Sequence, residues 1–228
     1  MTTKRDLRKE KNREAILEAA LEIAREETWE KVTIRKIADR ILYTPPIVYE
    51  HFKNKDDLLR QLVEQGFRQL NESTMAVLES DDAPGYRLKK MMEVRLAFNM
   101  EHTTVHQLMF DFSQPDWQRE IAMKHMGSIS EVALQAIMDH SGADEELAQE
   151  YFMNMVALVM GYTTLVSHFL DMSNHTQEMK AKMQQRLAEG HKPPLPMLKI
   201  MAPDGKQRVQ GMFNAAFDRF LNSIKNNM

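Results

Sequence analysis

The N-terminal end of the chain concentrates side chains that can bind a polyanion. Residues 1–13 contain six basic residues and only two acidic ones. Residues 1–60 carry 14 basic and 12 acidic side chains, a net charge of +2, whereas residues 61–228 carry 16 and 21, a net charge of −5. A charged tail is usually only solvated, but a basic arm on an acidic body suits a protein that contacts a polyanion with one end.

No residue pattern of a catalytic or metal site accompanies these charges. The chain has no cysteine, which excludes a thiol nucleophile, a cysteine metal cluster and a disulfide framework, and favours the cytoplasm. Its eight glycines form neither G-x-G-x-x-G nor a phosphate loop, and H-E-x-x-H and G-x-S-x-G are absent. His102 and His106 could face one metal, but two ligands are too few for zinc, and a packed or solvent-facing pair is the commoner case. We expect no enzyme, no metal and no cofactor.

Helical periodicity runs through almost the whole chain and predicts an all-α protein. Glycine and proline number only eight each, and no long strand alternation competes. The apolar spacing predicts helices at about 13–27, 34–41, just after Pro45-Pro46, 56–79, 86–100, 102–112, 116–139 and 144–171, and a last helix with its apolar stripe from Val209 to Ile224. Segment 173–205 is proline-rich and irregular; the pattern allows a short helix at 177–189, and a lid, a dimer arm and a loose loop all remain open.

One helix is long enough to raise the question of a membrane. Tyr151 to Leu170 contains no Asp, Glu, Lys or Arg over twenty residues, which is spanning length. It includes polar residues such as Asn154 and His168, and no basic flank orients it, so a buried helix is the better interpretation. The polar first residues predict no secretory signal peptide. We therefore expect a cytoplasmic protein without a membrane partner.

Three short helices within residues 13–53 suggest a helix-turn-helix, in which the third helix offers its first residues to the major groove. The pattern consists of R-x-x-I-L-x-A-A at 13–20, T-x-R-x-I-A at 33–38 and V-Y-x-H-F-K-N-K-x-x-L-L at 48–59. With these motifs, residues 10–62 resemble the N-terminal domain of the tetracycline-repressor (TetR) family of bacterial transcription regulators. The resemblance implies a helix-turn-helix domain over 1–62 and a helical ligand-binding and dimerisation domain over 63–228.

The resemblance also assigns roles to single residues. Thr33 would cap the second helix and meet a phosphate, Arg35 would face the groove or the phosphates, and Tyr49 and His51 would contact the DNA backbone. A plain N-cap, a surface arginine and a core aromatic are the structural alternatives for the first three. Lys55 opens a helix, where the dipole disfavours a cation, and a phosphate would offset that cost. The predicted DNA-contacting residues are Thr33, Arg35, Thr44, Pro45, Pro46, Tyr49, His51 and Lys55.

Two features depart from the family pattern. Leu42 stands where the family commonly has a glycine in a left-handed conformation, which costs a leucine about 1–2 kcal/mol. The expectation is a reshaped turn with a slightly re-aimed third helix. Pro45-Pro46 suits the first turn of a helix, but with Ile47 it offers apolar contact to thymine methyl groups and little hydrogen bonding. Base discrimination would then depend on Arg35, Thr44 and apolar contacts.

The remaining three quarters are expected to dimerise and to bind a small molecule. The last helix cannot bury its apolar stripe alone, and with the helix at 144–171 it could form an intermolecular four-helix bundle, although both could simply fill the monomer core. The 19 methionines are explained first by core packing and second by an adaptable pocket. The candidate ligand-lining residues are Phe98, His102, Met109, Phe110, Phe112, Trp117, Met155 and Tyr162.

These observations favour a homodimeric repressor that leaves a palindromic DNA operator when a small-molecule effector binds. The helices at 56–79 and 86–100 are the expected levers of that change. The alternative is a helical small-molecule carrier or enzyme in which the basic arm is incidental, and a helix-turn-helix used for protein contacts is a third. Salt-dependent affinity for duplex DNA separates the regulator from a carrier.

Overall fold

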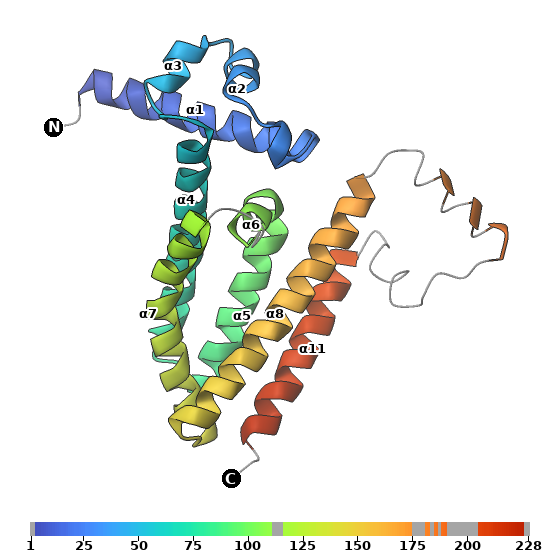
Figure 1. The fold of residues 1–228 in the computed structure, drawn as a ribbon. Coiled ribbons are helices and arrows are strands. Elements are labelled where there is room, and N and C mark those ends of the chain that lie inside the picture. Colours follow the sequence, from blue (N-terminus) through green and yellow to red (C-terminus); the bar gives the residue numbers. More distant parts are fainter. Residues whose placement is uncertain are drawn as a thin grey trace. The chain divides into compact units, whose positions relative to one another are not determined.

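Helices make up the regular structure of the described chain (Figure 1). The computed structural model describes residues 3–110, 116–174, 181–182, 185–186, 188–190 and 205–225, with side chains left out at 166–174 and 205–206. Its elements are α1 (Lys4–Glu26), η1 (Trp29–Lys31), α2 (Ile34–Arg40), α3 (Pro45–Tyr49), α4 (Lys55–Leu78), α5 (Pro84–Glu101), α6 (Thr103–Met109), α7 (Asp116–Ser141), α8 (Glu145–Asn174) and α11 (Gly205–Lys225). The all-α prediction is confirmed.

The chain forms two compact units, each built from two separate stretches. Unit 1 comprises Met1–Gln69 and Thr104–His125, and unit 2 comprises Leu70–Thr103 and Met126–Met228. Helix α4 contributes residues to both units, because it runs without a break from Lys55 to Leu78. The expected functional division near residue 62 stays a prediction.

Unit 1 is built on the contacts of α1 with η1 and α2, and of α2 with α3. Its buried residues are apolar side chains that lie mostly three or four residues apart along the helices. The fully or almost fully buried members are Ile16, Leu17, Ala20, Ile23, Val32, Ile37, Ala38, Val48, Phe52, Leu58 and Leu62. These residues fix the orientation of the short helices α2 and α3, which are too short to be stable alone.

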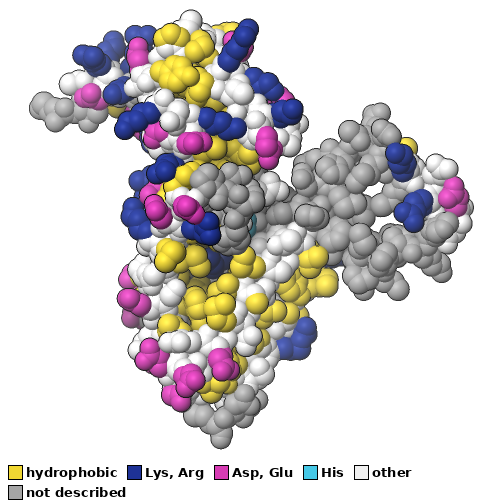
Figure 2. Space-filling view, viewed as in Figure 1, with side chains coloured by type: hydrophobic (Ala, Val, Ile, Leu, Met, Phe, Trp, Pro, Cys, Tyr) yellow, Lys and Arg dark blue, Asp and Glu magenta, His cyan; other side chains and the backbone are white. Residues whose placement is uncertain are grey.

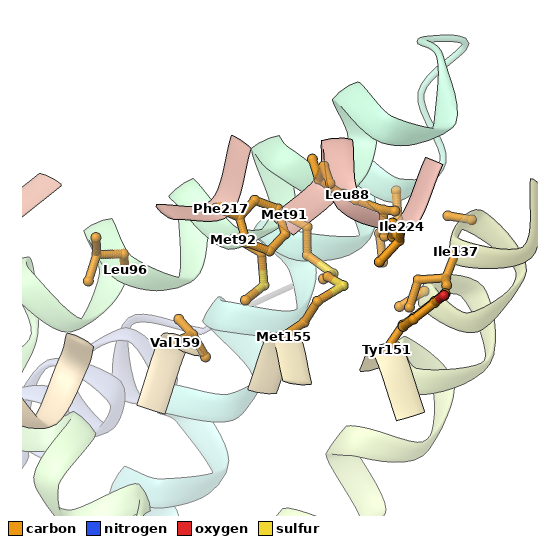
Figure 3. Close-up of a cluster of buried hydrophobic side chains, with 14 of the residues drawn as sticks. Leu88, Met91, Met92, Leu96, Ile137, Tyr151, Met155, Val159, Phe217 and Ile224 are labelled. Atoms are coloured by element: carbon orange, nitrogen blue, oxygen red, sulfur yellow. The ribbon is translucent and has the colours of Figure 1, made fainter. Parts of the chain in front are cut away.

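Unit 2 has its core where α5, α8 and α11 pack against one another. Helix α11 runs antiparallel to α8 (Figure 1). Figure 3 shows the centre of this cluster, where Met91 and Met92 of α5 lie beside Met155 of α8 and Phe217 of α11. The methionines of this region that are buried therefore pack in the core, which is the default interpretation of their abundance.

Several boundaries differ from the sequence prediction. Helix α1 begins nine residues before the predicted start at 13, because Thr3 and Asp6 form a reciprocal capping box at its N-terminus. The basic arm is therefore the first part of helix α1. The apolar spacing did not predict it, because the arm has no periodic apolar residues. Helix α6 ends at Met109, and the predicted helix at 177–189 lies largely outside the described residues. Within the described part of the chain, no helix is sufficiently long and apolar to cross a membrane.

Candidate nucleic-acid interface

The first turn of α2 carries two of the predicted DNA contacts. Thr33 is the N-cap, with extended backbone, and its Oγ1 accepts a hydrogen bond from the Lys36 backbone N–H at 3.2 Å. The capping role is confirmed, and its exposed hydroxyl keeps a hydrogen to donate. The Arg35 side chain is 86% exposed and lies 3.9 Å from the Asp39 carboxylate. A solvent-exposed ion pair at this distance contributes little to stability. The Arg35 guanidinium is therefore available to a phosphate or a base.

The turn between α2 and α3 keeps the left-handed conformation despite its leucine. Leu42 has a φ of 57° and is 92% exposed. The expectation of a reshaped turn is therefore wrong, because the leucine adopts the left-handed conformation that a glycine would supply. The helices α2 and α3 on either side maintain this strained conformation. The Tyr43 backbone N–H donates to the Ala38 carbonyl oxygen at 2.8 Å, which closes the end of α2.

The start of α3 presents a mixed apolar and hydroxyl surface. Thr44 is its exposed N-cap and makes no side-chain capping hydrogen bond, and Pro45 and Pro46 occupy the first helical turn. Pro46 is exposed, whereas Pro45 and Ile47 are half-buried. Figure 2 shows hydrophobic side chains at this end of unit 1 with Lys and Arg side chains on either side. Such a surface can contact thymine methyl groups while the flanking cations meet phosphates.

Tyr49 and His51 follow at the end of α3. Tyr49 is 55% exposed. His51 is half-buried, and its Nδ1 is buried without a hydrogen-bond partner among the described residues. Burial, with a smaller contribution from the positive charge of Lys9, lowers the pKa of His51. The imidazole is therefore neutral at pH 7, and the basic N-terminal part of α1 lies close enough to influence it.

Lys55 has a structural partner that the sequence did not indicate. Its Nζ donates to the Trp29 carbonyl oxygen at 2.7 Å, and burial lowers the pKa of this half-buried ammonium group. The carbonyl at η1 offsets part of the cost of a cation at the first residue of α4. Lys55 thus ties η1 to α4, and a contact of this residue with DNA stays a prediction.

Positioning residues that the sequence analysis missed hold α2 and α3 on α1. Arg40 pairs with Glu22 and Glu26 of α1 at 3.3 and 2.6 Å, and the Tyr43 hydroxyl donates to Asn12 Oδ1 at 2.9 Å. The acidic pair one turn apart on a predicted helix was a usable signal for Arg40. No spacing rule connects Tyr43 with Asn12, because that contact exists only once the helices have packed.

The candidate ligand-lining residues fall into two groups. Phe98, His102, Met155 and Tyr162 belong to unit 2, and Met109, Phe110 and Trp117 belong to unit 1; Phe112 lies outside the described residues.

In unit 2 the Phe98 and His102 rings are 4.7 Å apart, Met155 is in the core, and the Tyr162 hydroxyl donates to the Met212 carbonyl oxygen at 3.3 Å. In unit 1, Met109 packs against Gly66, the Phe110 ring is 5.5 Å from that of Phe67, and Trp117 is buried under Arg60. A shared ligand site stays a prediction.

His102 and His106 also differ in their surroundings. The His106 ring is 4.6 Å from that of Phe110 in unit 1, whereas His102 contacts Phe98 in unit 2. Both histidines therefore pack against aromatic rings. The described residues contain no group of three or more histidine, aspartate or glutamate side chains suited to a metal ion.

Known proteins share both the helix-turn-helix sequence and the fold. Residues 16–62 match the family described as bacterial regulatory proteins, tetR family. No curated protein matches the chain in sequence. Among solved structures, the TetR-family regulator PfmR from Thermus thermophilus is 17% identical over 91% of this chain and 97% of its own, with a TM-score of 0.58.

Two further structures cover nearly the whole chain. A TetR/AcrR-family regulator from Thermobifida fusca is 16% identical over 95% of this chain and 98% of its own, with a TM-score of 0.59. A Rhodococcus protein of unknown function is 18% identical over 92% and 94%, with a TM-score of 0.63. These likenesses show the fold. The family match identifies residues 16–62 as a helix-turn-helix domain like that of the tetR family of bacterial regulatory proteins.

Proposed function

We propose that the protein is a cytoplasmic, homodimeric repressor without enzymatic activity, which leaves a palindromic operator when a small-molecule effector binds. The observation that carries this proposal is the surface of α2 and α3. Thr33, Arg35, Thr44 and Tyr49 are all exposed and gathered on elements that the core of unit 1 holds in place. A carrier or a helical enzyme has no use for such a set beside a basic helix.

Two kinds of contact are expected to bind DNA, one to phosphates and one to base edges. The exposed basic residues of α1, from Lys4 to Lys11, supply affinity for phosphates at any sequence. Arg35 and Thr44 supply hydrogen bonds, and Pro45, Pro46 and Ile47 supply apolar contacts to base edges. The neutral His51 binds a phosphate as a hydrogen-bond donor, so its ring needs no prior protonation.

Homodimerisation is supported by an exposed stripe on α8. Met153, Met160 and Leu165 are 62%, 37% and 44% exposed, and Ala157 and Gly161 lie between them at helical spacing. The segment 153–165 contains no charged residue, and Figure 2 shows hydrophobic side chains gathered over α8. Together with the exposed Met212 of α11, this stripe suits an intermolecular four-helix bundle.

A charge within the stripe tests the dimer. Met160→Glu is expected to raise the dimer dissociation constant by about 100-fold or more, because the carboxylate would be buried without a partner. Analytical ultracentrifugation measures the change. Met123→Glu is the matched control, since Met123 is a methionine of unit 1 and is 77% exposed. A Met160→Glu variant that dimerises as tightly as the control would refute this interface.

The effector acts by changing the geometry in which the two copies present α3. Helices α4 and α5 are the proposed levers, because α4 begins directly after the helix-turn-helix and α5 crosses the core of unit 2. The effector must bind the released state more tightly than the DNA-bound state, since equal affinities shift nothing.

Selection of binding sites from random duplex DNA at two salt concentrations tests the regulator itself. We expect a two-fold symmetric site whose half-sites lie about 34–36 Å apart, with affinity that falls steeply as salt rises. A folded protein that enriches no site at low salt would refute the proposal and favour the carrier or the enzyme.

A further inference from the structure

One arginine of α5 lies in the row of residues that faces the core of unit 2. Leu88, Met91, Met92, Leu96, Phe98 and Asn99 are all at least 93% buried and follow one another at helical spacing. Arg95 is three residues after Met92 and four before Asn99, so its side chain leaves the helix on the same face. In Figure 3 this row runs along α5 from Leu88 to Leu96.

The Arg95 side chain is partly buried on the core-facing side of α5. Burial lowers its pKa to about 10, and no opposing charge or hydrogen bond of the described residues contributes to that shift. It therefore remains a cation at pH 7. The residue as a whole is only half-buried, so part of its surface is still accessible. Arg95 is therefore a cation on the core-facing side of α5 that is partly accessible.

No carboxylate of the described part of unit 2 neutralises this cation. The only partly buried acidic side chains there are Glu93 and Asp218, and each pairs with a lysine: Lys90 at 2.7 Å and Lys89 at 2.6 Å. Every other acidic side chain described in the unit is exposed. The wall that α8 presents between Tyr151 and Leu165 contains no charged residue.

A partly buried cation with no carboxylate beside it in the described part of unit 2 is costly, and proteins retain such a group where it has a use. We propose that Arg95 binds the oxyanion head group of the effector, a carboxylate or a phosphate, whose apolar body packs against the methionine and phenylalanine side chains around α5. A guanidinium suits either anion because its planar fork can donate two parallel hydrogen bonds. The proposal rests on the proposed function, in that it names the chemical class of the effector of that regulator.

The test compares anions with a neutral molecule of the same shape. Octanoate, octyl phosphate and octanol are titrated by calorimetry into the purified full-length protein and into Arg95→Met, which keeps a long apolar side chain without the charge. We expect the wild type to prefer at least one of the anions to octanol by about 10- to 100-fold, the range that a charge-assisted hydrogen bond supplies. A preference for octanoate or for octyl phosphate identifies the head group. Arg95→Met is expected to lose the preference.

A second measurement does not depend on the probes. Without any ligand, Arg95→Met is expected to melt about 2–4 °C higher than the wild type, because it removes an uncompensated buried charge. Arg87→Met is the matched control on the same helix. Arg87 donates to the Leu78 carbonyl oxygen at 2.7 Å, so its loss should lower the melting temperature and leave the anion preference intact.

Two results would overturn the proposal: a wild type that prefers neither anion to octanol, or an Arg95→Met variant that melts lower and keeps the preference. Operator binding by the ligand-free wild type and by ligand-free Arg95→Met is measured alongside. Loss of DNA binding in the wild type would refute the regulator, whereas the calorimetric and melting results would still decide the anion site.

Discussion

Replacement of Leu42 by glycine is expected to stabilise the protein although it removes a large side chain. The left-handed backbone of Leu42, with φ 57°, costs an L-residue about 1–2 kcal/mol. The side chain is 92% exposed and so gains almost nothing from burial. Glycine removes the strain but increases the freedom of the unfolded chain, which costs about 0.4–1 kcal/mol. The difference predicts a net gain of about 0–1.6 kcal/mol in the free energy of unfolding, with a midpoint of about 0.8 kcal/mol.

Urea unfolding followed by tryptophan fluorescence measures this gain in the right part of the molecule. The chain has two tryptophans, Trp29 and Trp117, and both belong to unit 1, which also contains Leu42. The fluorescence transition therefore reports on the unit in which the strain is relieved. We expect a higher midpoint with an unchanged slope, because the surface exposed on unfolding hardly changes.

Leu42→Ala separates the backbone from the side chain. Alanine also loses the exposed apolar surface but keeps a Cβ, so it retains the left-handed strain and should leave the midpoint close to that of the wild type. If alanine stabilised the protein as much as glycine, the effect would come from the exposed leucine side chain. A lower midpoint for Leu42→Gly would refute the strain itself.

Three further predictions concern other residues of unit 1. Arg35→Ala should weaken binding to the selected operator by roughly 10- to 100-fold, as loss of one base or phosphate contact does, with an unchanged urea midpoint; equal affinity in fluorescence anisotropy would exclude Arg35 from the interface. Lys55→Met should lower the free energy of unfolding by about 1–2 kcal/mol, because the Trp29 carbonyl loses a charged donor, and an unchanged midpoint would show that this bond does not brace unit 1. His51 has a pKa below its ordinary value of 6.5, so the unfolded chain binds more protons in that window and stability should fall as pH drops through it. His51→Gln should remove that part of the acid sensitivity in melting curves recorded from about pH 7 to pH 5, and identical pH profiles would contradict the shift.

Local rules predicted the parts of the helix-turn-helix that depend on neighbouring residues. The Thr33 cap and the start of α3 at Pro45 follow from short-range hydrogen bonding and from the fixed φ of proline. The apolar spacing placed the long helices because each must bury one face. The start of α1 was missed, since Thr3 and Asp6 form a capping box at the start of a stretch whose one apolar residue before Ala15 is Leu7, and a single residue gives no periodicity.

Contacts between elements were beyond sequence reasoning. The Trp29 carbonyl that accepts from Lys55 lies 26 residues earlier in the chain, and Asn12 lies 31 residues from Tyr43. Such distances are fixed by packing and leave no periodic signal. The same limit affected the candidate ligand residues. They were chosen by type and helix, and Phe98 and Trp117 proved to belong to different units.

Leu42 and Arg95 are two places where the chain keeps a locally unfavourable residue, and no contact among the described residues offsets either one. Natural sequences are mostly consistent from local preference to global fold, so departures from that consistency concentrate at functional sites. Leu42 takes the left-handed position of the turn before α3, and 92% of its surface is exposed. Arg95 interrupts the apolar row of α5. Glycine at position 42 and methionine at position 95 are each expected to favour folding. The proposed function gives both residues a reason: Leu42 lies in the turn before α3, the proposed DNA-reading helix, and Arg95 lies on the side of α5 that faces the core of unit 2, where the effector is proposed to bind.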